Sequence, residues 1–212
     1  MALPESYYDG AAKVCRDFPR KFPYWDRGLG LRVTARYLDA FLRELYEPEP
    51  FGLAGPLLIL DLGPGAGHLM EYAREAGHVV EGVDCYPGGE GVQGYKMMAE
   101  ARGLSVAYVG FHAVMLDRDV TWAPSPDGYH LIHASKSLGG IVSCHESALP
   151  EIPARRSKPF LDFCHGLLVP GGLLHLSHNA YDGLPAFCLE MSEHPGYRHE
   201  QLDKHNTRHW RI

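Results

Sequence analysis

The segment that most constrains the fold runs from Leu57 to Tyr86 and reads LLILDLGPGAGHLMEYAREAGHVVEGVDCY. An aliphatic run is followed by a glycine-rich bend, a helical pattern and a second aliphatic run, and each aliphatic run carries an aspartate near its end. This order predicts a strand over 57–62, a helix over 67–76 and a second strand over 78–84.

The same alternation continues along the chain. Further strands are predicted over 104–111, 127–135 and 173–179, with helices over 92–103 and 158–168 and a turn at the PGG stretch 170–172. Strands that alternate with helices at this period indicate an open, mostly parallel, doubly wound α/β sheet with helices on both faces.

The end of the chain has a weaker pattern. Only 33 residues follow Asn179, and they are polar and rich in histidine. We therefore expect a C-terminal strand hairpin to be abbreviated or absent. If it is absent, the fifth strand is a sheet edge that needs cover, and a homodimer is one way to provide it.

At 212 residues the chain has the length of one domain. We divide it into an N-terminal helical and aromatic lid segment over 1–50 and a ligand-binding α/β domain over 51–212. The lid segment has four aromatic residues that could line an apolar substrate pocket or could equally be core: Tyr7, Tyr8, Tyr24 and Trp25.

The composition of the chain limits the partners and the cellular compartment that we expect. The formal net charge of -6 argues against a large nucleic-acid surface, which needs clustered Lys and Arg. No apolar run approaches the roughly 20 residues of a membrane helix, and no signal peptide is visible. The five cysteines are widely spaced without a C-x-x-C pair, so we expect a reduced, cytoplasmic protein.

The glycine-rich bend carries the ligand chemistry. Gly63, Gly65 and Gly67 let the chain turn sharply and let a ligand approach the backbone, while the following helix points free N–H groups into the same space. Asp84 can accept two hydrogen bonds from a ribose diol. Asp61 would repel a pyrophosphate and instead suits a ligand with a cationic amino group or a polar, water-bridged tail.

These two acidic motifs, LDLGPGAG and VEGVDCY, resemble those of class I S-adenosylmethionine-dependent methyltransferases, which have a Rossmann-like fold. The resemblance covers about residues 57–179. It implies S-adenosylmethionine as cofactor and S-adenosylhomocysteine as product. It also implies the following cofactor-binding residues: Asp61, Gly63, Gly65, Gly67, Asp84, Cys85, His112 and Ala134.

For methyl transfer to a small-molecule acceptor, a general base is expected after the fourth or fifth strand, and His178, His145 and His133 are the candidates. No metal site is expected. His175 and His178 are three apart on a strand and so point to opposite faces. His205 and His209 would align on a helix but have no convincing third ligand.

Three alternatives stay open at this stage. A nucleic-acid methyltransferase often carries Asp/Asn-Pro-Pro-aromatic after the fourth strand, where this chain reads HASKSL. An NAD-dependent oxidoreductase is disfavoured by Asp61 and by the lack of a Tyr-x-x-x-Lys motif. A non-catalytic protein that retained the cofactor pocket would fit the unusual His112 and His130 and the short tail.

Overall fold

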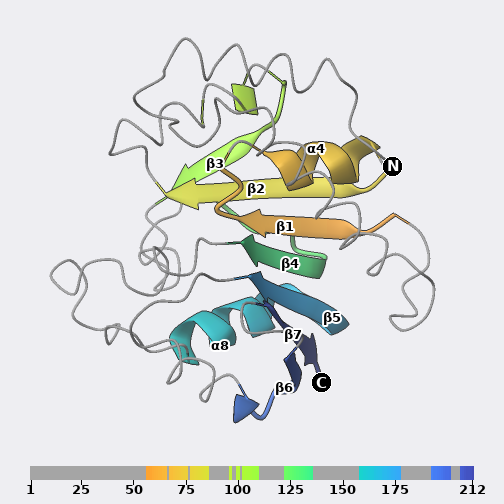
Figure 1. Ribbon diagram of the computed structural model, residues 1–212, viewed down its shortest axis with the longest axis vertical. Coiled ribbons are helices and arrows are strands. Elements are labelled where there is room, and N and C mark those ends of the chain that lie inside the picture. The colour runs from red at the N-terminus through yellow and green to blue at the C-terminus, as the bar shows by residue number, and fades with distance from the viewer. Residues whose placement is uncertain are drawn as a thin grey trace, which may run out of the picture.

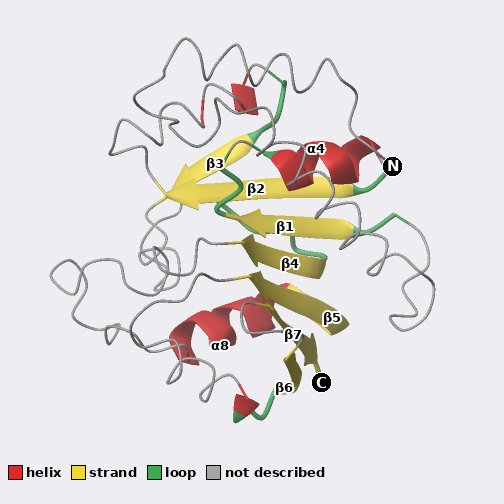
Figure 2. Cartoon of the chain, viewed as in Figure 1, coloured by secondary structure: helices red, strands yellow, loops and turns green. Residues whose placement is uncertain are grey.

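The computed structural model describes residues 56–65, 67–75, 77–85, 96, 99–100, 102–109, 122–135, 158–177, 192–201 and 206–212. Within this part of the chain a seven-stranded sheet has the strand order β3-β2-β1-β4-β5-β7-β6. Helix α4 lies beside β2 toward one end of the sheet, and helix α8 lies beside β5 toward the other (Figure 1, Figure 2). The predicted open, mostly parallel α/β sheet is thereby confirmed.

The observed elements lie close to the predicted ones. The strands are β1 (Leu58–Leu62), β2 (Val79–Cys85), β3 (Val106–Val109), β4 (Tyr129–Ser135), β5 (Leu168–Ser177), β6 (Tyr197–Gln201) and β7 (Asn206–Arg211), and the helices with described bounds are α4 (His68–Glu75) and α8 (Lys158–Leu167). Three residues of the predicted helix over 92–103, Lys96, Ala99 and Glu100, are helical. None of the described helices is long and apolar enough to cross a membrane.

The two described helices cover opposite faces of the sheet. A Cβ at Gly82 would lie 2.5 Å from the Met70 sulfur, so α4 packs directly on the face of β2 that carries Gly82. Gly82 pairs with Asp61 of β1, which lies on the same face. Phe160 of α8 clusters instead with Leu60 and Leu62, which point to the other face because strand side chains alternate.

Burial on both faces explains why β1 reads as a continuous aliphatic run rather than an alternating one. Ile59, Leu60 and Leu62 are all completely buried. The parallel strand β2 pairs with β1 along its length, and β4 pairs with its residues from Ile59 to Asp61. The first strand is therefore the centre of the core as well as the strand that leads into the glycine bend.

The C-terminal hairpin is present, as two short antiparallel strands of five and six residues. β7 pairs with β5 from Leu173–Trp210 to Ser177–Asn206. β5 is therefore not a sheet edge, and the edge-based reason for expecting a homodimer no longer applies. His209 lies in strand β7, so the alignment that a helix would give it with His205 does not apply; His205 is outside the described residues.

The start of β5 also differs from the prediction. The strand begins at Leu168, directly after α8, so the PGG stretch lies inside it instead of leading into it. The register jumps from the pair Tyr129–Leu168 to the pair Leu131–Leu173. Gly172 lies at this irregularity. A Cβ at position 172 would lie only 2.8 Å from the Val169 carbonyl oxygen. The three residues are a bulge that keeps the strand in the sheet.

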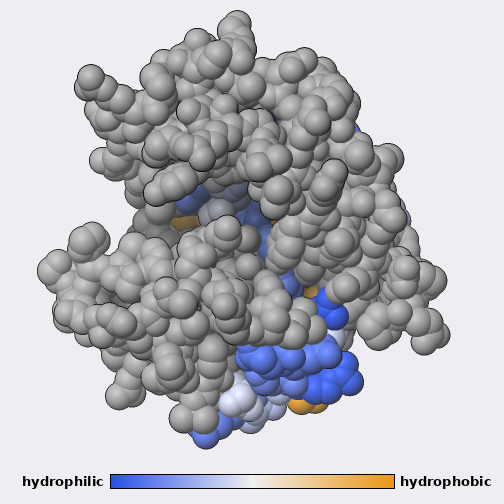
Figure 3. Space-filling view, in the orientation of Figure 1, coloured by the Kyte–Doolittle hydropathy of each residue, from blue (hydrophilic) through white to orange (hydrophobic). Residues whose placement is uncertain are grey.

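Polar contacts tie the hairpin to α8. The buried Tyr197 hydroxyl donates to the Leu161 carbonyl over 3.1 Å, and His194 Nε2 lies 2.9 Å from the Asp162 carboxylate. The visible described surface over β6 and β7 is mostly hydrophilic (Figure 3), with Arg198, Glu200 and Gln201 exposed. A polar outer strand of this kind disfavours pairing with another chain.

Removing the Tyr197 hydroxyl tests this attachment. Tyr197→Phe leaves the buried Leu161 carbonyl without this donor, so we expect a loss of about 1 kcal/mol in the free energy of unfolding. Urea denaturation followed by circular dichroism measures it. An unchanged midpoint would show that the hydroxyl does not stabilise the contact between hairpin and helix.

Candidate cofactor-binding site

The strand order reverses between β1 and β4, since β2 and β3 lie on one side of β1 and β4 and β5 lie on the other. In open α/β sheets ligands bind outside the carboxyl ends of the strands at this switch point. Asp61, near the end of β1, pairs in register with His133, near the end of β4. The predicted loop, both predicted aspartates and one predicted histidine therefore come from strands that meet at this edge.

The loop after β1 needs glycine for its shape. Gly63, Gly65 and Gly67 have φ values of 73°, 54° and 81°, in the left-handed region that glycine adopts without strain. The Gly63 N–H donates to the Val83 carbonyl over 2.7 Å, and the Gly67 N–H donates to the Pro64 carbonyl over 2.9 Å. These bonds fold the loop back over the ends of β1 and β2 and start α4.

Gly67 is also held by close packing, and this gives a test. A Cβ at Gly67 would lie 2.4 Å from Leu104 Cδ1, whereas Gly77, with a similar φ of 89°, has open space around it. Gly67→Ala is expected to destabilise the protein by about 2–3 kcal/mol, and Gly77→Ala by about 1 kcal/mol from backbone strain alone. Thermal denaturation compares them, and equal losses would contradict the close packing of the loop.

Asp84, predicted to bind a ribose, is in contact with the loop. The Gly65 N–H donates to Asp84 Oδ2 over 3.3 Å, and the carboxylate is half-buried. Tyr108 pairs with Asp84 from β3. Burial, Asp84 and Glu100 together raise the pKa of Tyr108 to about 12, so its hydroxyl stays protonated beside the carboxylate.

Asp61 lies in a very different environment. Its side chain is only 3% exposed. Burial, and secondarily the charge of Asp84, raise its pKa to about 8, because a carboxylate loses its hydration when it leaves water. At pH 7 the group is therefore mostly protonated, and a cation brought beside it would favour ionisation.

His133 forms a buried pair with His175 of β5. The two Nδ1 atoms are 3.0 Å apart, and both side chains are at most 2% exposed. The ring planes differ by only 8° while the centroids are 5.1 Å apart, so the rings meet edge to edge through their nitrogens. Burial lowers the pKa of His133 to about 4, and burial together with neighbouring cationic groups lowers that of His175.

The remaining predicted site residues fall into three groups. His112, His145 and His178 lie outside the described residues, as does the lid segment over 1–50. Cys85 ends β2 at the same edge of the sheet, but its side chain is not described. Ala134 is completely buried in the core cluster with Phe160 of α8. The roles predicted for these residues stay predictions.

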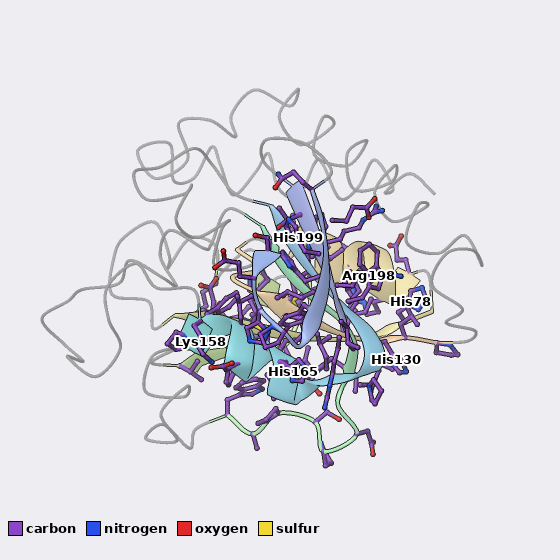
Figure 4. All side chains as sticks on the ribbon, turned by 90° about the horizontal axis from the view of Figure 1, so that it is seen from below. His78, His130, Lys158, His165, Arg198 and His199 are labelled. Carbon is purple, nitrogen blue, oxygen red and sulfur yellow. The ribbon has the colours of Figure 1, made fainter. Side chains whose placement is uncertain are left out.

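His130, three residues before His133, has a different place. Its Nδ1 accepts the Leu58 N–H over 3.0 Å, and His78 Nδ1 accepts the Leu57 N–H over 3.0 Å. Both histidines therefore hold the amino end of β1, away from the glycine loop, and they lie on the same side of the molecule in Figure 4. His130 has a structural role.

The sequence pattern did not identify three residues that lie beside the predicted site residues. His175 had been weighed only as a metal ligand beside His178, and Arg208 and Tyr108 had not been singled out. A signal was available for His175, since IHAS and LHLS end two neighbouring strands with histidine at the same distance from the end.

In the described part of the chain no group of three or more His, Cys, Asp or Glu side chains could hold a metal ion.

Comparison with known proteins gives a fold. No protein-family model and no curated protein sequence matches the chain. Among solved structures, it is similar to a precorrin-6y C5,15-methyltransferase from Geobacter metallireducens GS-15, at 14% identity and a TM-score of 0.51, over 84% of this chain and 89% of that one.

Two further solved structures of methyltransferases are also similar to the chain. Human methyltransferase-like protein 13, crystallised with SAH (S-adenosylhomocysteine), has 18% identity and a TM-score of 0.51 over 83% of this chain and 80% of that one. The CurJ carbon methyltransferase has 12% identity and a TM-score of 0.56 over 91% of this chain and 57% of that one. The fold is that of the class I S-adenosylmethionine-dependent methyltransferases.

Proposed function

We propose that this protein is an S-adenosylmethionine-dependent methyltransferase that acts on a small-molecule acceptor. The observation that carries the proposal is the contact between the Gly65 N–H and Asp84 Oδ2. It joins the glycine loop and the acid of the second strand, which are far apart in the chain, at the switch point of the sheet. Of the two, the loop would hold the methionine part and Asp84 the ribose.

The charges of the site fit this ligand. Asp61 and Asp84 are near enough for the charge of Asp84 to raise the pKa of Asp61. The negative charge of Asp84, beside an Asp61 that a cation would ionise, favours a cationic ligand over a pyrophosphate. The amino group of the methionine part supplies one positive charge beside Asp61, and the sulfonium supplies another. A nicotinamide dinucleotide would place a pyrophosphate at this loop instead.

When bound, S-adenosylmethionine supplies a methyl group that its sulfonium already activates. The chain must then hold the acceptor in line and exclude water, and such positioning contributes up to about 7–11 kcal/mol in well-oriented reactions. A base that removes a proton from a hydroxyl acceptor adds roughly 10²–10⁴-fold. We keep His145 and His178 as proposed bases, and residues 1–50 as the proposed cover over the acceptor.

The choice of a small molecule rests on charge. The formal net charge is -6, and a nucleic-acid substrate needs a basic surface. Incubation with S-adenosylmethionine and either a low-molecular-weight cell filtrate or purified RNA and DNA separates the two. We expect S-adenosylhomocysteine to form only with the filtrate, and formation only with nucleic acid would reject the small-molecule assignment.

A thermal-shift series tests the cofactor. A ligand at 100 times its Kd stabilises the folded state by about 2.7 kcal/mol. We therefore expect S-adenosylmethionine and S-adenosylhomocysteine each to raise the Tm by several degrees, and NAD to leave it unchanged. A shift with NAD alone would replace the methyltransferase proposal by an oxidoreductase.

A further inference from the structure

We propose that Arg208, His175 and His133 form a polarised row of buried side chains that presents His133 to Asp61 as an N–H donor, so that His133 is a positioning residue for cofactor binding and not a base. The inference rests on the proposed function for the identity of the ligand. Its first test concerns only the ligand-free protein.

The register of the sheet builds the row. Asp61 of β1 pairs with His133 of β4, His133 pairs with His175 of β5, and His175 pairs with Arg208 of β7. Paired residues on neighbouring strands point to the same face. All four side chains are buried, with at most 8% of any of them exposed. Four ionisable groups thus lie side by side across one buried face.

The imidazole pair contains one shared proton. Its Nδ1 atoms approach to 3.0 Å in nearly coplanar rings, which is the geometry of an in-plane N–H···N hydrogen bond. One Nδ1 must then carry a hydrogen and the other must accept it. A neutral imidazole has one N–H, so the ring that accepts at Nδ1 carries its own hydrogen on Nε2.

Arg208 determines which of the two rings carries its hydrogen on Nδ1. A ring that turns Nδ1 toward β4 turns its Nε2 edge toward β7, so His175 directs Nε2 to the side of Arg208, its paired residue. Burial lowers the His175 pKa most, and the charges of His133, Arg208 and His209 lower it further. A guanidinium is positively charged and has no acceptor, so on the Arg208 side a nitrogen lone pair is favoured over a second N–H. It therefore favours a bare Nε2 and an Nδ1–H on His175. His133 then accepts at Nδ1 and carries Nε2–H.

The same geometry directs that N–H. His133 turns Nδ1 toward β5, so its Nε2 edge faces β1, where Asp61 is its paired residue. When the ligand's ammonium group binds, Asp61 releases its proton to solvent and becomes a carboxylate. The His133 Nε2–H can then donate to it. The charge of Asp84 also acts on Asp61 and favours its protonated form until a cation binds.

The tautomers can be read directly. Long-range ¹H–¹⁵N correlation spectra of the full-length, ligand-free protein distinguish Nδ1–H from Nε2–H rings, and His133→Gln and His175→Gln assign the two spin systems among the 13 histidines. We expect Nε2–H on His133 and Nδ1–H on His175. The opposite pattern would overturn the proposal and return His133 to the candidate bases.

A binding series tests the consequence by calorimetry with S-adenosylhomocysteine in buffers of different ionisation enthalpy. His133→Phe removes the donor and should weaken binding about tenfold, as expected for a hydrogen bond to a charged group. His133→Gln keeps an amide N–H near the Nε2 position and should restore most of the affinity. Equal affinities of all three proteins would overturn the proposal.

A matched control comes from the hairpin. His199 forms a similar pair with His209, with Nδ1 atoms 3.2 Å apart, and lies on the outermost strand. His199→Gln should leave affinity and proton release unchanged.

If His133→Phe does not fold, His175→Leu replaces it. This variant frees His133 from its fixed tautomer and should also weaken binding, and an unchanged affinity of His175→Leu would contradict the row. If the unaltered protein binds no S-adenosylhomocysteine, the proposed function fails while the spectra still decide the tautomers.

Discussion

Asp84→Ala is expected to weaken binding of S-adenosylmethionine and S-adenosylhomocysteine by about 10²–10⁴-fold. A carboxylate that accepts both hydroxyls of a ribose makes two charge-assisted hydrogen bonds, each contributing about 1.5–3 kcal/mol. The side chain also fixes the loop through the Gly65 N–H, so its removal loosens the other half of the site. Calorimetric titration at constant pH measures the change.

Two further variants sharpen this result. Asp84→Asn keeps an acceptor of the same shape without the charge and should lose about tenfold. Asp127→Ala removes an exposed carboxylate in the turn before β4 and should have no effect, which controls for net charge. Equal affinities for Asp84→Ala and the unaltered protein would remove Asp84 from the ribose site.

Asp61→Asn is expected to stabilise the ligand-free protein at alkaline pH and to have little effect near pH 4. The folded-state pKa of Asp61 is raised from 3.8 to about 8. The folded state therefore holds a proton that the unfolded state has lost, and this group lowers stability progressively as pH rises through that interval. At about 1.4 kcal/mol per pKa unit, the cost reaches about 6 kcal/mol above pH 8.

Asparagine removes this cost because it keeps the shape of the side chain and stays neutral. Chemical denaturation at pH 4, 6 and 9 should show a stability difference that grows with pH. The same variant should bind S-adenosylmethionine less tightly, because it cannot become the anion that pairs with an ammonium group. A stability difference independent of pH would show that Asp61 ionises normally in the folded protein.

The parallel core could be predicted because its chemistry is local. Strands buried on both faces must be aliphatic along their whole length, and LLIL before the glycine bend shows this directly. The glycine bend and the two aspartates were predictable for a similar reason. Strand ends and tight turns have strong sequence requirements, so Asp61, Gly65 and Asp84 could be placed before the structure was known.

The hairpin could not be predicted in this way because its buried positions are polar. Thr207 and His209 of β7 are completely buried, and the Thr207 hydroxyl lies 3.0 Å from His209 Nε2. The side chains satisfy each other's hydrogen bonds instead of forming an apolar stripe. A search for alternating hydrophobic residues therefore finds no strand in NTRHWR.

The imidazole pair escaped prediction for a different reason. His133 and His175 are 42 residues apart, and their contact depends on the register of two parallel strands. The bulge in β5 sets that register, and its three residues had been read as a turn before the strand. Long-range register is a property of the assembled sheet and not of either segment alone.

The central claim is that the loop from Gly63 to Gly67, with Asp61 and Asp84, binds S-adenosylmethionine. Isothermal titration of the purified protein with S-adenosylhomocysteine tests it most directly. The account predicts a single saturable site whose binding releases protons near pH 7, as Asp61 ionises. A titration without heat beyond dilution, in buffers of both high and low ionisation enthalpy, would contradict it.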